Sequence, residues 1–118
     1  MRMRLLLSLV LLASTTAASA QEKISPCAWR TARAFSEELN KSELSDKIKH
    51  CSVTCLVTIE CSRFSARTLG WAKEFADLLG MGQAEIADLA ANELGIDLAL
   101  KGRATSAPEC RSACALYY

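Results

Sequence analysis

Six cysteines and a single histidine are the residues of this chain whose types and spacing could support chemistry. Cys51 and Cys55 are four positions apart, and so are Cys110 and Cys114. On an α-helix the two thiols of each pair fall on one face, about 40° apart around the axis. Two helices that carry such pairs can be joined face to face by two neighbouring disulfides. The chemistry that this spacing favours is therefore covalent cross-linking.

A disulfide inside either pair is disfavoured, because the two Cβ atoms point in nearly parallel directions on one helix. Pairing between the two helices remains, and two connectivities satisfy it. If the helices are antiparallel, the bonds are Cys51–Cys114 and Cys55–Cys110; if they are parallel, the partners exchange. We favour the antiparallel arrangement.

The two remaining cysteines complete the framework. Cys61 lies about 80° around the helix from Cys51, so it faces a different neighbour. Cys27, in the first turn of the first expected helix, is left as its partner, which gives Cys27–Cys61. A zinc site combining His50 with cysteines is the alternative, and an exported context disfavours it. The sequence predicts three structural disulfides, no metal and no cofactor.

Acidic and amide side chains form a second candidate group. They lie on two helices expected over residues 64–79 and 83–94, joined by a Gly-x-Gly turn: Glu74, Asp77, Glu85, Asp88 and Asn92. Paired carboxylates can act as general acid and base or hold a hard cation. The competing interpretations are a solvated charged face and a buried Asp88–Asn92 hydrogen-bond network. A catalytic site using His50 with Glu74 or Asp88 is kept as an alternative to a purely structural role.

The first twenty residues have the features of a cleaved signal peptide. Arg2 and Arg4 precede the apolar run Leu5 to Leu12, and a small-x-small pattern ends at Ala20. Residues 21–118 then form one domain with a net charge of 12 − 13 = −1, since residues 1–20 hold two of the 14 basic residues and none of the 13 acidic ones. This balance gives no reason to expect nucleic-acid binding, and no apolar run is long enough to span a membrane.

The elements that position these residues are expected to be helices, because apolar residues recur every three or four positions and glycine and proline are scarce. We expect helices over 26–40, from 42 or 45 to 62, over 64–79 and 83–94, and a short last helix opened by Ser106 with Glu109. Most residues of the segment 53–59 are β-branched, which favours extended backbone, so a strand is the competing prediction there. Gly80 and Gly95 are expected to end helices, with a looser segment over 96–105. The residues predicted to face inward are Trp29, Ala32 and Phe35; Ile48, Cys51, Cys55, Leu56 and Ile59; and Phe64, Thr68, Trp71, Phe75, Leu78 and Leu79.

Two short motifs carry family resemblances. The Asp88-x-x-Ala-Asn92-x-x-Gly95 segment, after a Gly-x-Gly turn, resembles the later helices of serum amyloid A proteins. Together with the His-Cys-x3-Cys opening at His50, it also resembles cysteine-framed segments of bacterial Rhs-type polymorphic proteins. The first resemblance implies a small helical bundle and lipid or apolar-ligand binding; the second implies a bacterial envelope or competition context. In both, Asp88, Asn92 and Gly95 occupy positions that imply structural roles, namely side chains bonding backbone and a glycine helix cap.

The sequence therefore predicts an all-α domain, a small bundle of four to five short helices stapled by three disulfides. We expect an exported, periplasmic or extracellular module that binds a protein partner such as a toxin, an inhibitor target or an envelope component, and that is not an enzyme. The alternatives are a small hydrolase or toxin acting on envelope material through His50 with Glu74 or Asp88, and binding of lipid or another apolar ligand.

Overall fold

The computed structural model describes residues 25–76 and 86–118, except for the side chains of residues 73–76 and 86. This part of the chain forms five α-helices and contains no strand. The predicted all-α fold class is confirmed, and the competing strand over 53–59 is not formed. The helices are α2 (Pro26–Leu39), α3 (Asp46–Glu60), α4 (Arg63–Ala76), α5 (Ile86–Leu100) and α6 (Ala107–Ala115).

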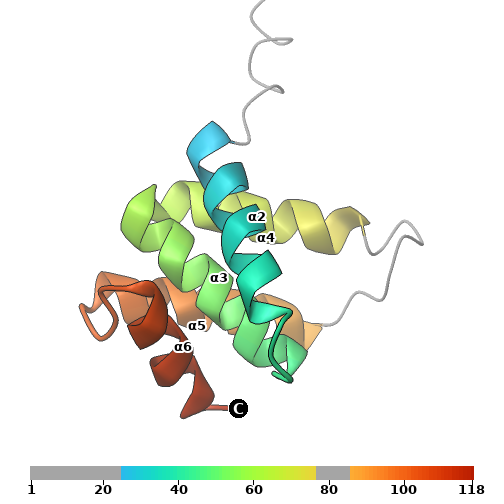
Figure 1. Cartoon of the computed structure of the whole chain (residues 1–118). Helices are drawn as coiled ribbons and strands as arrows, with labels where there is room; N and C mark the ends of the chain where they lie inside the picture. The colour runs from blue at the N-terminus through green and yellow to red at the C-terminus, as the bar shows by residue number, and fades with distance from the viewer. Residues whose placement is uncertain (1–24, 77–85) are drawn as a thin grey trace, which may run out of the picture.

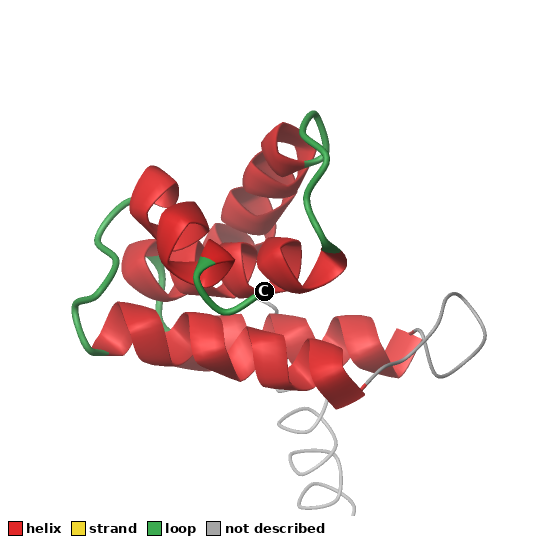
Figure 2. Cartoon of the chain, turned by 90° about the horizontal axis from the view of Figure 1, so that it is seen from below, coloured by secondary structure: helices red, strands yellow, loops and turns green. Residues whose placement is uncertain are grey.

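Helix α3 is the centre of the bundle and contacts each of the other four helices (Figure 1). Helix α5 also contacts α4 and α6, and α2 also contacts α4. Seen from below, the described segments are helices joined by short loops (Figure 2). A helix covered on most sides needs buried residues around most of its circumference. The buried residues of α3 meet this need, namely Ile48, Cys51, Ser52, Thr54, Cys55, Leu56 and Val57. Burial overrides the weaker helix propensity of the β-branched residues among them.

Serine caps begin three of the helices. At the start of α4 the hydroxyl of Ser62 accepts a hydrogen bond of 3.0 Å from the backbone N–H of Ser65. The hydroxyl of Ser45 accepts a hydrogen bond of 3.3 Å from the backbone N–H of Ile48, which fixes the start of α3. Ser106 accepts one of 3.3 Å from the N–H of Glu109, as the sequence predicted for the last helix. The Glu109 carboxylate in turn accepts bonds from the hydroxyl and the N–H of Thr105, and these bonds lower the pKa of Glu109. Such caps satisfy backbone groups that the first helical turn leaves unpaired.

The three disulfides join the pairs that the antiparallel arrangement predicts: Cys27–Cys61, Cys51–Cys114 and Cys55–Cys110. No cysteine is free. The two bonds between α3 and α6 join residues 63 and 55 positions apart, and each could stabilise the fold by about 4 kcal/mol on the chain-entropy estimate. Helix α6 has only nine residues, which is too short to persist alone in water, so these two bonds hold it in place.

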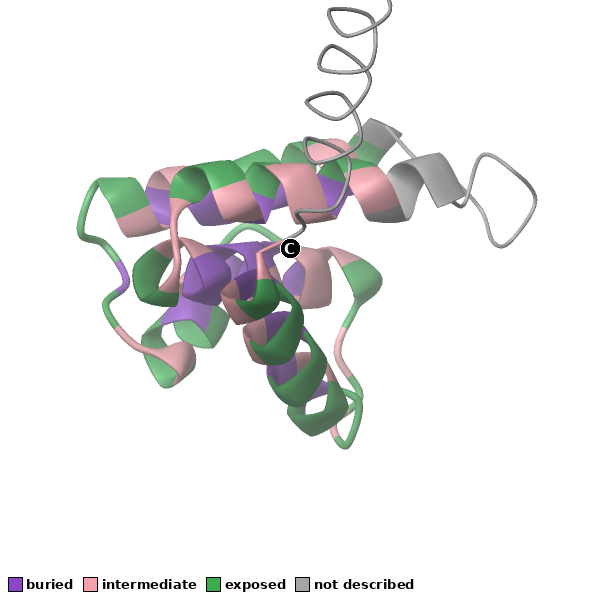
Figure 3. Ribbon diagram, turned by 90° about the horizontal axis from the view of Figure 1, so that it is seen from above, coloured by how far each residue is buried: buried purple, intermediate pink, exposed green. Residues whose placement is uncertain are grey.

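Buried apolar side chains form three neighbouring groups, and α3 contributes to all of them. Figure 3 colours the ribbon by burial, with buried residues in purple. The first lies between α2, α3 and α6, the second between α2, α3, α4 and α5, and the third between α3, α5 and α6. The members are, in that order, Phe35, Leu39, Cys55, Leu56, Ala104 and Cys110; Ala28, Ala32, Val57, Ala66 and Ile96; and Ile48, Cys51, Ala91, Leu98 and Cys114. The second group is built mostly from small residues, so α2 and α4 lie close to the bundle there.

The prediction that Gly95 ends a helix is wrong, because α5 continues to Leu100. Among the described residues, the one with a left-handed backbone is Gly102, with φ of 68°. A Cβ atom at Gly95 would overlap the backbone oxygen of Cys51 and the hydroxyl of Thr54. Gly95 is therefore needed for the close approach of α5 to α3, and its role as a helix cap is excluded. The expected loose segment accordingly shrinks to the loop between α5 and α6.

Four residues predicted to face inward are exposed instead. The exposed fractions are 56% for Trp29, 36% for Ile59, 75% for Phe64 and 58% for Trp71. Large apolar side chains recur at helical spacing in each of these segments, and periodicity does not reveal which apolar face a helix buries. The predictions for Leu78, Leu79, Gly80 and the start of the fourth helix lie outside the described residues, as does the side chain of Phe75.

Helix α4 buries a face of smaller residues. Ala66 and Gly70 are buried, and Leu69 packs against the second core group. A Cβ atom at Gly70 would lie 2.9 Å from the amide nitrogen of Asn92 on α5. Small residues allow this close approach, whereas Phe64 or Trp71 would hold the helices apart. Packing distance therefore selects the small face and leaves the aromatic face outside.

Candidate functional site

The residues of the two sequence motifs meet along the seam between α3 and α5. Helix α3 contributes His50 and Thr54, and α5 contributes Asp88, Asn92 and Gly95. In each set the residues are three, four or seven positions apart, so they share one side of their helix. The seam thus brings together two segments that lie far apart in the sequence.

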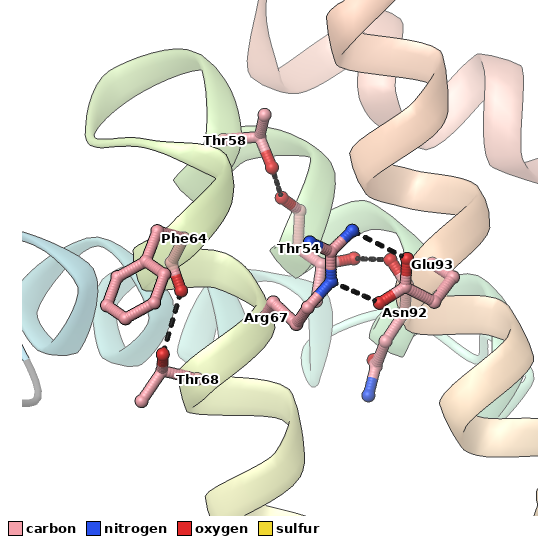
Figure 4. Close-up of polar contacts among 7 residues, drawn as sticks. All are labelled: Thr54, Thr58, Phe64, Arg67, Thr68, Asn92 and Glu93. Carbon is pink, nitrogen blue, oxygen red and sulfur yellow. Dashed lines mark hydrogen bonds and ion pairs between the residues drawn. The ribbon is translucent and has the colours of Figure 1, made fainter.

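Thr54 links the two helices by a hydrogen bond at the middle of this seam. Its hydroxyl donates to the backbone oxygen of Asn92 at 2.8 Å (Figure 4). The same hydroxyl lies 3.0 Å and 3.2 Å from the backbone oxygens of His50 and Cys51 in its own helix. A hydroxyl has one proton, so these three acceptors share it. The arrangement is suited to holding two helices at a fixed distance.

A charged cluster lies at one end of the seam. The Asp88 carboxylate is 2.6 Å from the Lys47 ammonium and 3.6 Å from Nε2 of His50. The side chain of Asp88 is 8% exposed, and those of Lys47 and His50 are mostly buried. The sequence reasoning missed Lys47, although it precedes His50 by three positions and so lies on the same side of α3.

The geometry of this cluster favours a structural role. A buried carboxylate is stable when a cation neutralises it, and Lys47 does this at short distance. The distance of 3.6 Å between His50 and Asp88 is too long for a good hydrogen bond. His50 and Asp88 are nevertheless neighbours, as the catalytic alternative requires. The side chain of Glu74 lies outside the described residues, so its proposed role stays a prediction.

The resemblance implies that the Asn92 side chain bonds backbone, but its Nδ2 group makes no such hydrogen bond. That nitrogen is buried and has no hydrogen-bond partner in the described part of the chain. It lies against Gly70, so the amide packs at the contact between α4 and α5. Asp88 likewise contacts side chains, those of Lys47 and His50. The motif residues organise contacts between helices.

An ion pair also joins α4 to α5. Two guanidinium nitrogens of Arg67 lie 2.8 Å and 3.0 Å from the two carboxylate oxygens of Glu93 (Figure 4). The hydrogen bonds from Arg67 lower the pKa of Glu93. A bidentate pair fixes orientation better than a single contact does. Helix α4 is thus held on the bundle by both its buried small residues and this pair.

The opposite side of α4 carries exposed aromatic residues. Phe64 and Trp71 are seven positions apart, so they lie in line along the helix, with Thr68 between them. We call Phe64 and Trp71 the aromatic stripe. In Figure 4 the ring of Phe64 points away from α5, while Arg67 points toward it.

In the described residues, no group of histidine, cysteine, aspartate and glutamate is placed to hold a metal ion. None of the helices described there is long and apolar enough to cross a membrane. No family model matches the chain, and neither the curated proteins nor the solved structures include a significant match.

Proposed function

We propose that this protein is an exported, non-catalytic module that binds a protein partner through the aromatic stripe of α4. The observation that carries the proposal is the exposure of Phe64 and Trp71 on a helix whose other side is already packed. Exposed apolar side chains that gather on one face mark interaction surfaces more often than isolated ones do. Aromatic residues are also enriched at the centres of protein interfaces.

The stripe is presented on a rigid support. Helix α4 is fixed by the Ala66 and Gly70 contacts and by the Arg67–Glu93 pair. Ordering a surface before binding reduces the entropy lost in the complex. A bundle with three disulfides therefore suits a role in which shape matters more than movement, and the disulfides are consistent with an oxidising compartment.

Charge indicates what the partner should look like. Helix α4 carries three basic residues and one acidic residue, and one of the basic residues, Arg67, is paired with Glu93 on α5. Arg63 is exposed next to Phe64, and Arg30 is exposed next to Trp29 on α2, whereas Arg33 pairs with Glu37. The complementary surface is an apolar protein ridge bordered by acidic side chains. A membrane is a weaker fit, because residues 21–118 have a net charge near −1 and Arg67 is already paired.

Capture from envelope extract with immobilised, oxidised protein tests the proposal when it is run with matched variants. Phe64→Ser/Trp71→Ser should abolish retention of the captured protein. Leu116→Ser removes an apolar residue after α6 that is more exposed than either aromatic residue, and it should leave retention intact. The captured protein is then purified, and its direct binding to both variants is measured. Capture that survives the double variant, or binding of anionic vesicles in place of any protein, contradicts the proposal.

The hydrolase alternative rests on the proximity of His50 and Asp88. A proton-transfer role would need His50 to reach a substrate while Asp88 orients it. The close Lys47–Asp88 pair argues against it, since it occupies the carboxylate. Turnover of an envelope substrate that is lost in His50→Gln, with the fold retained, would establish this alternative and overturn the binding role.

A further inference from the structure

The three disulfides differ in their access to solvent. Cys51, Cys55, Cys110 and Cys114 are all 0% exposed. Cys27 and Cys61 are only partly buried, at the surface where α2 begins and α3 ends. A thiolate can break a disulfide only if it reaches one of the two sulfurs in line with the bond. A dissolved thiolate can therefore reach the Cys27–Cys61 bond more easily than the two bonds between α3 and α6.

We propose that the Cys27–Cys61 bond is a thiol–disulfide exchange site for a dithiol reductant, and that the two bonds between α3 and α6 are not. The reductant thiolate attacks one sulfur and forms a mixed disulfide, while the other cysteine leaves as a thiolate. The second thiol of the reductant then displaces the first cysteine. In total the protein disulfide gains two electrons and two protons, and the reductant becomes a disulfide.

The local structure indicates which sulfur is attacked. Cys27 is the second residue of α2, after Pro26, and the first turn of α2 has no acidic residue. Negative charge is favoured at a helix N-terminus, as at Cys27, whereas Cys61 lies between the C-terminus of α3 and the start of α4, whose effects oppose each other. Cys27 is therefore the better leaving group, and the incoming thiolate bonds to Cys61. The hydroxyl of Thr31, 3.8 Å from the Cys61 sulfur, lies beside the reacting bond.

Opening this bond should loosen only the start of α2. Phe35 and Leu39, farther along α2, stay in the first core group. Ala28 and Ala32, near the bond, pack with Val57 and Ala66 and lose their covalent anchor. The change would be confined to the α2 and α4 side of the bundle. It does not depend on the proposed binding role, because it concerns the accessibility of a bond.

Native reduction tests the proposal directly. The full mature protein is treated with graded dithiothreitol without denaturant, free thiols are trapped with iodoacetamide, and labelled peptides are mapped. We expect Cys27 and Cys61 to be labelled first, with the other four cysteines slower by on the order of tenfold or more. Circular dichroism should show that most of the helix content persists at that stage.

Two further measurements keep the test decisive. Cys27→Ser/Cys61→Ser should show no early labelling, while its remaining four cysteines react as slowly as in the wild type. When the wild type is treated with a small monothiol and the mixed disulfide is trapped and mapped, the thiol should be bonded to Cys61. Simultaneous labelling of all six cysteines, or earlier labelling of a buried pair, overturns the proposal.

Discussion

The two sides of α3 are built on different principles. Toward α5 and α6, α3 is joined by two fully buried disulfides and by a close seam at Gly95 and Thr54. Toward α2 and α4, the only covalent link is partly exposed, and aromatic residues face solvent. The comparison separates a part that maintains the fold from a part that presents a surface. It also explains why the motif residues, which lie on the first side, need not mark an active site.

The largest effect is expected from removing the two buried disulfides. Cys110→Ser/Cys114→Ser should release α6 and the loop after Leu100, because a nine-residue helix is marginal alone. Helices α2 to α5 should stay largely formed, with an overall loss of several kcal/mol at about 4 kcal/mol per bond. Hydrogen exchange by mass spectrometry checks this. Uniform loss of protection through all helices would show that the two sides are not separable.

A large local effect is expected at the seam. Gly95→Ala should destabilise the fold by about 3 kcal/mol, because the added methyl group overlaps backbone of α3 that cannot move easily. Gly102→Ala is the matched control. Its left-handed backbone costs about 1 kcal/mol, and nothing lies close to the new methyl group. Urea unfolding compares the two. Equal losses would mean that the seam is looser than we describe.

A smaller effect is expected from the charged cluster. Asp88→Asn should cost about 2 kcal/mol, because it removes the carboxylate charge that lies 2.6 Å from the mostly buried ammonium of Lys47. Asp97→Asn removes an exposed i,i+4 pair with Lys101 and should cost less than about 0.5 kcal/mol. Thermal and urea unfolding of both variants provide the measurement. A loss in Asp88→Asn no greater than that in the control would rule out a structural role for the cluster.

The sequence predicted most of what is covalent and local. Cysteine spacing indicated the disulfides, and the Ser106–Glu109 pattern indicated the start of α6. The prediction for Gly95 failed because the sequence does not distinguish a glycine needed for close approach of two helices from a glycine needed for a left-handed turn. The prediction for Phe64 and Trp71 failed because α4 has two apolar faces. Which face is buried depends on the distance to α5, and no local pattern contains that distance.

The smallest effect is a pH dependence at α6. Hydrogen bonds from Thr105 lower the pKa of Glu109 in the folded state, so its charged form stabilises the fold. That contribution is present above the ordinary glutamate pKa and is lost as the pH falls through the lowered folded-state value. Glu109→Gln should therefore be less stable than the wild type at neutral pH and converge with it in acid. A difference that persists unchanged in acid would exclude this origin.

The most direct test of the central claim is the unfolding free energy of Phe64→Ser/Trp71→Ser, measured in urea. If the aromatic stripe faces solvent and serves binding, deleting both rings should change stability by no more than about 1 kcal/mol, as for other exposed positions. If these residues formed the core face of α4, the same change would cost about 6 kcal/mol or more, at about 3 to 5 kcal/mol for each ring. A loss of that size would contradict the account.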